Sequence, residues 1–93
     1  MLWLGSMEVT PTIVAIREKA DAIRKAELER TLSGMSHLSD KEKKSIDKMT
    51  SAMMNKILHH PIVYLKQEDS HKDKKAKLAL VRKFFNLDPE NPD

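Results

Sequence analysis

Cysteine is absent from this sequence of 93 residues, and glycine, proline and aromatic residues are scarce. Without cysteine there is no disulfide, no thiolate metal site and no cysteine nucleophile, which fits a reducing compartment, so a cytoplasmic location is expected. The only glycines are Gly5 and Gly34, too few for a G-x-G-x-x-G or phosphate-binding loop. No apolar run approaches the ~20 residues that span a bilayer, and no signal peptide is recognisable, so no membrane association is expected.

The residues that are present favour one small helical domain. Hydrophobic residues make up 40% and charged residues 33%, and turn-forming residues are too few to support a sheet. The net charge of +3 permits weak contact with RNA phosphates. The aromatic residues that a nucleic-acid reader interleaves with its basic ones are missing, however. We therefore predict an all-α fold, a small helical bundle of three to four helices that dimerises through its long first helix.

The first helix is expected over residues 11–35, with Thr10 as N-cap and Pro11 at the first helical position. At 100° per residue it carries two apolar stripes, rotated by roughly a quarter to a third of a turn. One stripe holds Ile13, Ile16, Ala20 and Ile23, and the other holds Leu28, Leu32 and Met35. Two neighbours within one chain would explain both stripes, and so would self-association.

A second helix is expected to begin at a capping box formed by Ser39 and Glu42 and to end near His59. Its apolar stripe contains Ile46, Met49, Met53 and Ile57. Methionines at helical spacing are more often core than a partner-binding surface, so this stripe is expected to pack inside the chain.

The C-terminal part of the chain is expected to be divided by proline. The pair His60-Pro61 predicts a break, followed by a short helix over residues 61–67. A charged loop over residues 68–75 contains a cap formed by Ser70 and Asp73, and a last helix runs to about Asn86, where Leu87 adds a closing contact. Residues 88–93 are expected to form a disordered tail.

No catalytic, cofactor-binding or metal site is expected. His59 and His60 are adjacent and diverge by about 100° on a helix, so they cannot share a metal as an i,i+4 pair does. The carboxylates form no pair suited to general acid–base chemistry. Glu27 and Arg30 lie near the first apolar stripe and are expected to form a solvated ion pair.

The run I-R-E-K-A-D-A-I-R-K-A-E-L-E-R-T-L at residues 16–32, followed by N-K-I-L-H-H-P at residues 55–61, resembles the C-terminal dimerisation domain of glutamyl-tRNA reductase. Trp3 precedes Thr12-Ile13 at the spacing of that family. Thr31 and Ile57 depart mildly from the alanine and leucine usual there.

The resemblance implies a parent enzyme that reduces glutamyl-tRNA with NADPH to glutamate-1-semialdehyde, the entry to tetrapyrrole (porphyrin) biosynthesis. In the family the catalytic cysteine and the tRNA-contacting surface lie in an N-terminal domain, a nucleotide-binding domain comes next, and a spinal helix connects them to the dimerisation domain. None of these parts is in this sequence, so neither NADPH nor tRNA is expected to bind it. Residues 1–10 are then the remnant of the spinal helix and a linker, and residues 11–87 the dimerisation domain.

The expected function is therefore to hold two subunits together. The homodimer interface is expected to include Ile13, Ile16, Ala20, Ile23, Glu27, Leu28 and Leu32. The alternative is a free-standing helical module that binds a partner helix in an exposed groove and is monomeric.

Overall fold

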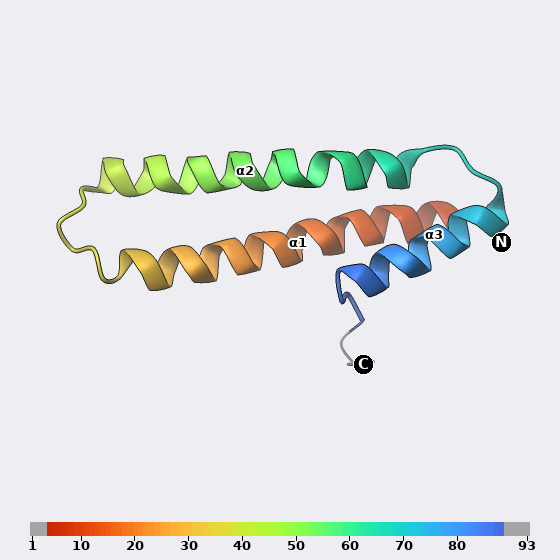
Figure 1. The fold of residues 1–93 in the computed structure, drawn as a ribbon, viewed down its shortest axis with the longest axis horizontal. Coiled ribbons are helices and arrows are strands. Elements are labelled where there is room, and N and C mark those ends of the chain that lie inside the picture. The colour runs from red at the N-terminus through yellow and green to blue at the C-terminus, as the bar shows by residue number, and fades with distance from the viewer. Residues whose placement is uncertain (1–3, 89–93) are drawn as a thin grey trace.

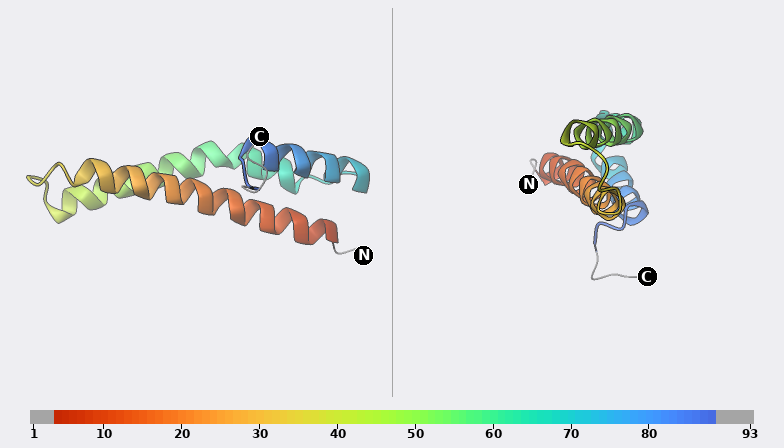
Figure 2. Two further views of the ribbon diagram at one scale, coloured as in Figure 1. Left: turned by 90° about the horizontal axis from the view of Figure 1, so that it is seen from below. Right: turned by 90° about the vertical axis from the view of Figure 1, so that its left-hand side faces the viewer.

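The computed structural model describes residues 4–88 and consists, over that range, of three helices without strands (Figure 1). Helix α1 spans Leu4–Leu32, α2 spans Asp40–Lys66 and α3 spans His71–Phe84. Helices α1 and α2 form an antiparallel hairpin, and the shorter α3 lies along the N-terminal half of α1, where it contacts both (Figures 1 and 2). The prediction of an all-α bundle is confirmed.

Two predicted helix starts are confirmed by their caps. The Glu42 backbone N–H donates to Ser39 Oγ at 3.1 Å, and the Ser39 N–H donates to Glu42 Oε1 at 2.8 Å, which is a complete capping box. At α3 the Asp73 N–H donates to Ser70 Oγ at 3.2 Å. The preceding loop is consequently shorter than predicted, since the helix already begins at His71.

The first helix begins earlier than predicted. Pro11 lies inside α1, which starts at Leu4, so Thr10 is not its N-cap. Residues 4–10, expected to be the end of a spinal helix and a linker, are continuous with α1. A proline in a helix forfeits one backbone hydrogen bond, and packing can offset that loss. Val9, two residues before Pro11, packs against the core. That contact favours a helix that extends through Pro11 to the residues before it. The predictions for residues 1–3 lie outside the described residues.

Helix α2 also continues through its proline. The break expected at His60-Pro61 is wrong, because α2 runs without interruption to Lys66. Leu58, Ile62 and Leu65 occupy positions i, i+4 and i+7 and are at most 5% exposed. A break at residue 60 would separate these three side chains, and their burial outweighs one lost hydrogen bond.

Replacing Pro61 by alanine is therefore expected to stabilise the fold by about 1 kcal/mol, because the helix regains a backbone N–H donor. Two smaller effects oppose this gain: the unfolded chain becomes more flexible, and the contacts of the proline ring are lost. Urea denaturation at equal protein concentrations measures this difference. An unchanged or lower stability would mean that α2 is broken at this proline in solution.

The core lies where the three helices meet. It consists of Ile16, Leu58, Ile62, Leu65, Leu78 and Val81, with Val9, Ile13, Ala20, Phe85 and Leu87 packed around it. The contact predicted for Leu87 is thus confirmed. Helix α3 ends at Phe84, two residues early, in a Schellman motif with Asn86 at a φ of 52°.

Two cations attach α3 to its neighbours. Lys77 is buried and donates to the Tyr64 carbonyl at 2.7 Å and to Asp69, so it caps the C-terminal end of α2. Arg82 donates to Thr12 Oγ1 at 3.0 Å and forms an ion pair with Asp88. Asp88, the first residue of the expected disordered tail, is thus paired with a residue of α3. Residues 89–93 lie outside the described residues.

Candidate dimer interface

Helix α3 packs against only one half of the α1–α2 hairpin (Figure 1). We call the part formed by residues 21–32 of α1 and 40–57 of α2 the distal arm; it projects beyond the end of α3 (Figures 1 and 2). Every residue from 21 to 57 is described, and none of them is buried. The radius of gyration is 16.8 Å, whereas a compact domain of this length has about 12 Å. The distal arm thus has no core of its own.

An apolar groove of about 490 Å³ runs between the two helices of the distal arm. Its lining is Ile23, Arg24, Glu27, Leu28, Thr31, Leu32, Met35, Ile46, Met49, Thr50, Met53 and Met54. Ile23, Met49 and Met53 are each at least half exposed. Large apolar side chains gathered in this way on a surface mark a site of protein association.

The predicted interface residues fall into two groups along α1. Ile16 is 1% exposed and belongs to the core of the chain, and Ile13 and Ala20 pack against that core. The remaining four, Ile23, Glu27, Leu28 and Leu32, line the groove. The stripe from Ile13 to Ile23 is therefore divided: its N-terminal part packs within the chain, and Ile23 lies on an open surface.

The apolar stripe of α2, of which Ile46, Met49 and Met53 line the groove, was not predicted as a surface. Met49, Met53 and Ile57 are 55%, 50% and 59% exposed, so the expectation that this stripe packs inside the chain is wrong. The spacing identified the stripe correctly. It could not show that α3 leaves this stripe uncovered, because that depends on how the three helices pack.

Arg24, which sequence analysis did not single out, connects the two helices on the groove wall. Its side chain is only 7% exposed. On α1, the guanidinium donates to Asp21 Oδ1 at 2.7 Å. On α2, it donates to Asp47 and to Thr50 Oγ1, the latter at 3.3 Å. Because the distal arm has no buried apolar contact, this polar brace contributes to holding its helices together. By contrast, the Glu27–Arg30 ion pair is exposed on both sides, as predicted.

The brace lowers the pKa of the Asp21 carboxyl. The hydrogen bond from Arg24, with a second contribution from Lys25, holds the pKa of Asp21 below its ordinary value of 3.8. A lowered carboxyl pKa stabilises the fold above the ordinary value, and this stabilisation disappears as the pH falls through the folded-state pKa.

Asp21→Asn is accordingly expected to lower stability near neutral pH and to lose this deficit below pH 3.8. Denaturation curves of both chains across that range measure the difference. A deficit that stays constant with pH would show that the carboxylate charge is not what Arg24 requires.

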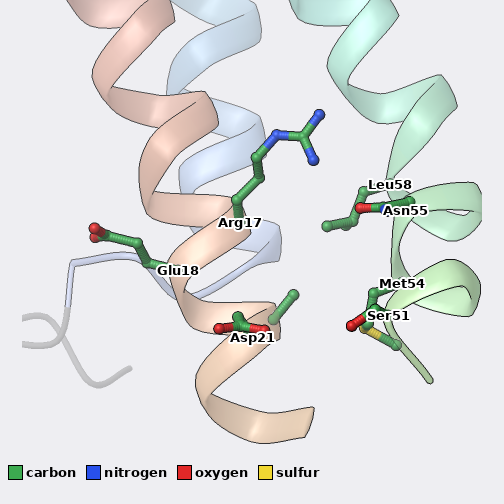
Figure 3. Close-up of a pocket in the computed structure, with 8 residues that line it drawn as sticks. Arg17, Glu18, Asp21, Ser51, Met54, Asn55 and Leu58 are labelled. Carbon is green, nitrogen blue, oxygen red and sulfur yellow. The ribbon is translucent and has the colours of Figure 1, made fainter. Parts of the chain in front are cut away.

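A second hollow, of about 350 Å³, lies between α1 and α2 nearer the core (Figure 3). Arg17 extends into the space between the helices, Glu18 points away from α2, and Ser51, Asn55 and Leu58 lie opposite on α2. These groups form no nucleophile–base pair or carboxylate pair. Within residues 4–88, no three side chains of the kinds that ligate metals gather at one place.

Residues 4–88 also contain no helix that is both long and apolar enough to cross a bilayer.

Comparison with known proteins identifies the family. The model of the glutamyl-tRNA(Glu) reductase dimerisation domain matches residues 1–87. The glutamyl-tRNA reductase of Syntrophobacter fumaroxidans is 42% identical over 85 residues, which cover 91% of this chain and 18% of that protein. That of Citrifermentans bemidjiense is 45% identical over 86 residues, covering 92% of this chain and 20% of the relative.

The chain thus spans about a fifth of the length of the curated relatives it matches. No solved structure shows significant similarity to it. The family match covers all three helices and the whole groove, and it agrees with the resemblance seen in the sequence. The chain belongs to the glutamyl-tRNA reductase dimerisation-domain family.

Proposed function

We propose that this chain forms a homodimer through the groove of the distal arm and so joins two subunits of a glutamyl-tRNA reductase. The observation that carries the proposal is an apolar groove between two helices that have no third helix to cover it. A second copy supplies the missing surface because, in an isologous interface, the same groove meets itself about a twofold axis.

The charge distribution supports a second copy as the occupant. Apolar side chains dominate the groove, and the cation on its wall, Arg24, is already neutralised by Asp21 and Asp47 within its own chain. Glu27, the other charged side chain of the groove, forms an ion pair with Arg30. A copy can therefore dock without bringing an unpaired charge into the interface. Of the predicted interface residues, Ile23, Glu27, Leu28 and Leu32 are in position for this contact, together with Met49 and Met53.

The role within the parent enzyme follows from this contact and from the names of the relatives. Pairing through the distal arm fixes the distance between two copies of whatever precedes residue 11, so that each subunit can receive its own bulky tRNA. We expect the parent to reduce glutamyl-tRNA with NADPH in tetrapyrrole biosynthesis in the cytoplasm. The NADPH, the tRNA and the catalytic residues belong to other parts of that protein; residues 11–87 supply the dimer.

Light scattering over a dilution series of this 93-residue chain tests the proposal. The expected result is twice the mass of 10.7 kDa at high concentration, falling toward the monomer mass on dilution. A monomer at every concentration would contradict the proposal and favour a free-standing module that binds a helix of another protein.

A further inference from the structure

Methionine is concentrated in the groove. The chain has six methionines, and Met35, Met49, Met53 and Met54 all line this one surface. Met49 and Met53 are 55% and 50% exposed, while Met35 and Met54 are half-buried. Because the chain has no cysteine, methionine thioethers are its groups for reversible oxidation by peroxide.

Oxidation would change the chemistry of the groove. The methionine sulfur attacks one oxygen of a hydroperoxide; an S–O bond forms, the O–O bond breaks, and water or an alcohol leaves. The sulfur is oxidised by two electrons and the peroxide is reduced by two. The product, a sulfoxide, is a polar hydrogen-bond acceptor in place of an apolar group.

Apart from the hydroxyl of Thr31, the groove offers few hydrogen-bond donors to this polar group once it is covered. The guanidinium of Arg24 on its wall already donates to Asp21, Asp47 and Thr50. A sulfoxide buried against apolar neighbours without a donor loses its hydrogen bonds to water and gains none. In an isologous dimer each modified residue occurs twice, so the penalty is doubled.

We propose that Met49 and Met53 are oxidation sites through which peroxide controls self-association of this domain; the inference rests on the proposed dimer. Both side chains are at least half exposed in the single chain and would be covered in the proposed dimer. Oxidation therefore proceeds through the dissociated form and holds the chain there until the sulfoxides are reduced.

The test compares the dimer dissociation constant before and after treatment of the 93-residue chain with dilute hydrogen peroxide. Peptide mass spectrometry identifies the oxidised residues, and sedimentation equilibrium measures the constant. We expect oxidation at Met49 and Met53 ahead of Met35 and Met54, and a rise in the dissociation constant of about a hundredfold or more. Methionine sulfoxide reductase with a thiol reductant should restore the original value.

The matched comparison is the double variant Met49→Leu, Met53→Leu, measured against itself. Whatever its starting dissociation constant, the ratio after and before peroxide should stay near one. An unchanged constant in the unmodified chain despite complete oxidation of both residues would overturn the inference, and so would preferential oxidation of Met35 or Met54. A chain that is monomeric before peroxide is added contradicts the proposed dimer instead, so the two failures are distinguishable.

Discussion

The Met53→Glu variant is expected to be monomeric at concentrations at which the unmodified chain is dimeric. Met53 is half exposed on α2 and lines the groove. In the dimer the glutamate would be buried against apolar side chains of the partner, and the twofold axis would bury two such charges. We expect the dissociation constant to rise by about a hundredfold or more.

Val63→Glu is the matched control for this experiment. Val63 lies on the same helix and is 41% exposed, but it does not line the groove. Its substitution should leave the dissociation constant within a few-fold, since surface changes away from an interface are usually worth less than about 0.5 kcal/mol. Sedimentation and circular dichroism together separate loss of dimer from loss of helix. Equal effects of both variants would contradict the assignment of the groove.

The Ile16→Ala variant is expected to lose fold stability rather than dimer contact. Ile16 is 1% exposed and packs with Leu58 and Leu65 at the junction of the three helices. Truncating a buried isoleucine costs about 2–5 kcal/mol. That is a large share of the roughly 5–15 kcal/mol by which a small domain is typically stable.

The decisive measurement introduces Ile16→Ala into the Met53→Glu chain. In that monomeric background a core residue should still cost about 2–5 kcal/mol in urea denaturation, because its contacts are within the chain. An interface residue would cost almost nothing there. The second outcome would return Ile16 to the dimer interface, where sequence analysis had placed it.

The sequence contained enough local information to predict the helices but not all of their ends. Ser39 with Glu42, and Ser70, specify helix starts through side chains within three residues of the cap, so these starts were predictable. Pro11 and Pro61 were interpreted as boundaries because proline alone disfavours a helix interior. Contacts of Val9 and Ile62 with residues far along the chain overrode that preference, and no local pattern contains them.

The candidate interface divides in the same way. Apolar spacing identified the stripes on α1 and α2, because helical periodicity places such residues on one side wherever they pack. It could not distinguish Ile16, which is buried within the chain, from Ile23, which is 56% exposed on the same stripe. That difference depends on where α3 ends against α1.

The sequence by itself thus determined the helical class, two of the caps, the apolar stripes and the family resemblance, since each of these depends on residues close together in the chain or on a recognisable motif. Only the tertiary structure decided which parts of those stripes are core and which are surface. The reason is physical: burial depends on the whole arrangement of α1, α2 and α3. Helix α3 has only 14 residues and α2 has 27, so α3 leaves the part of α2 in the distal arm uncovered.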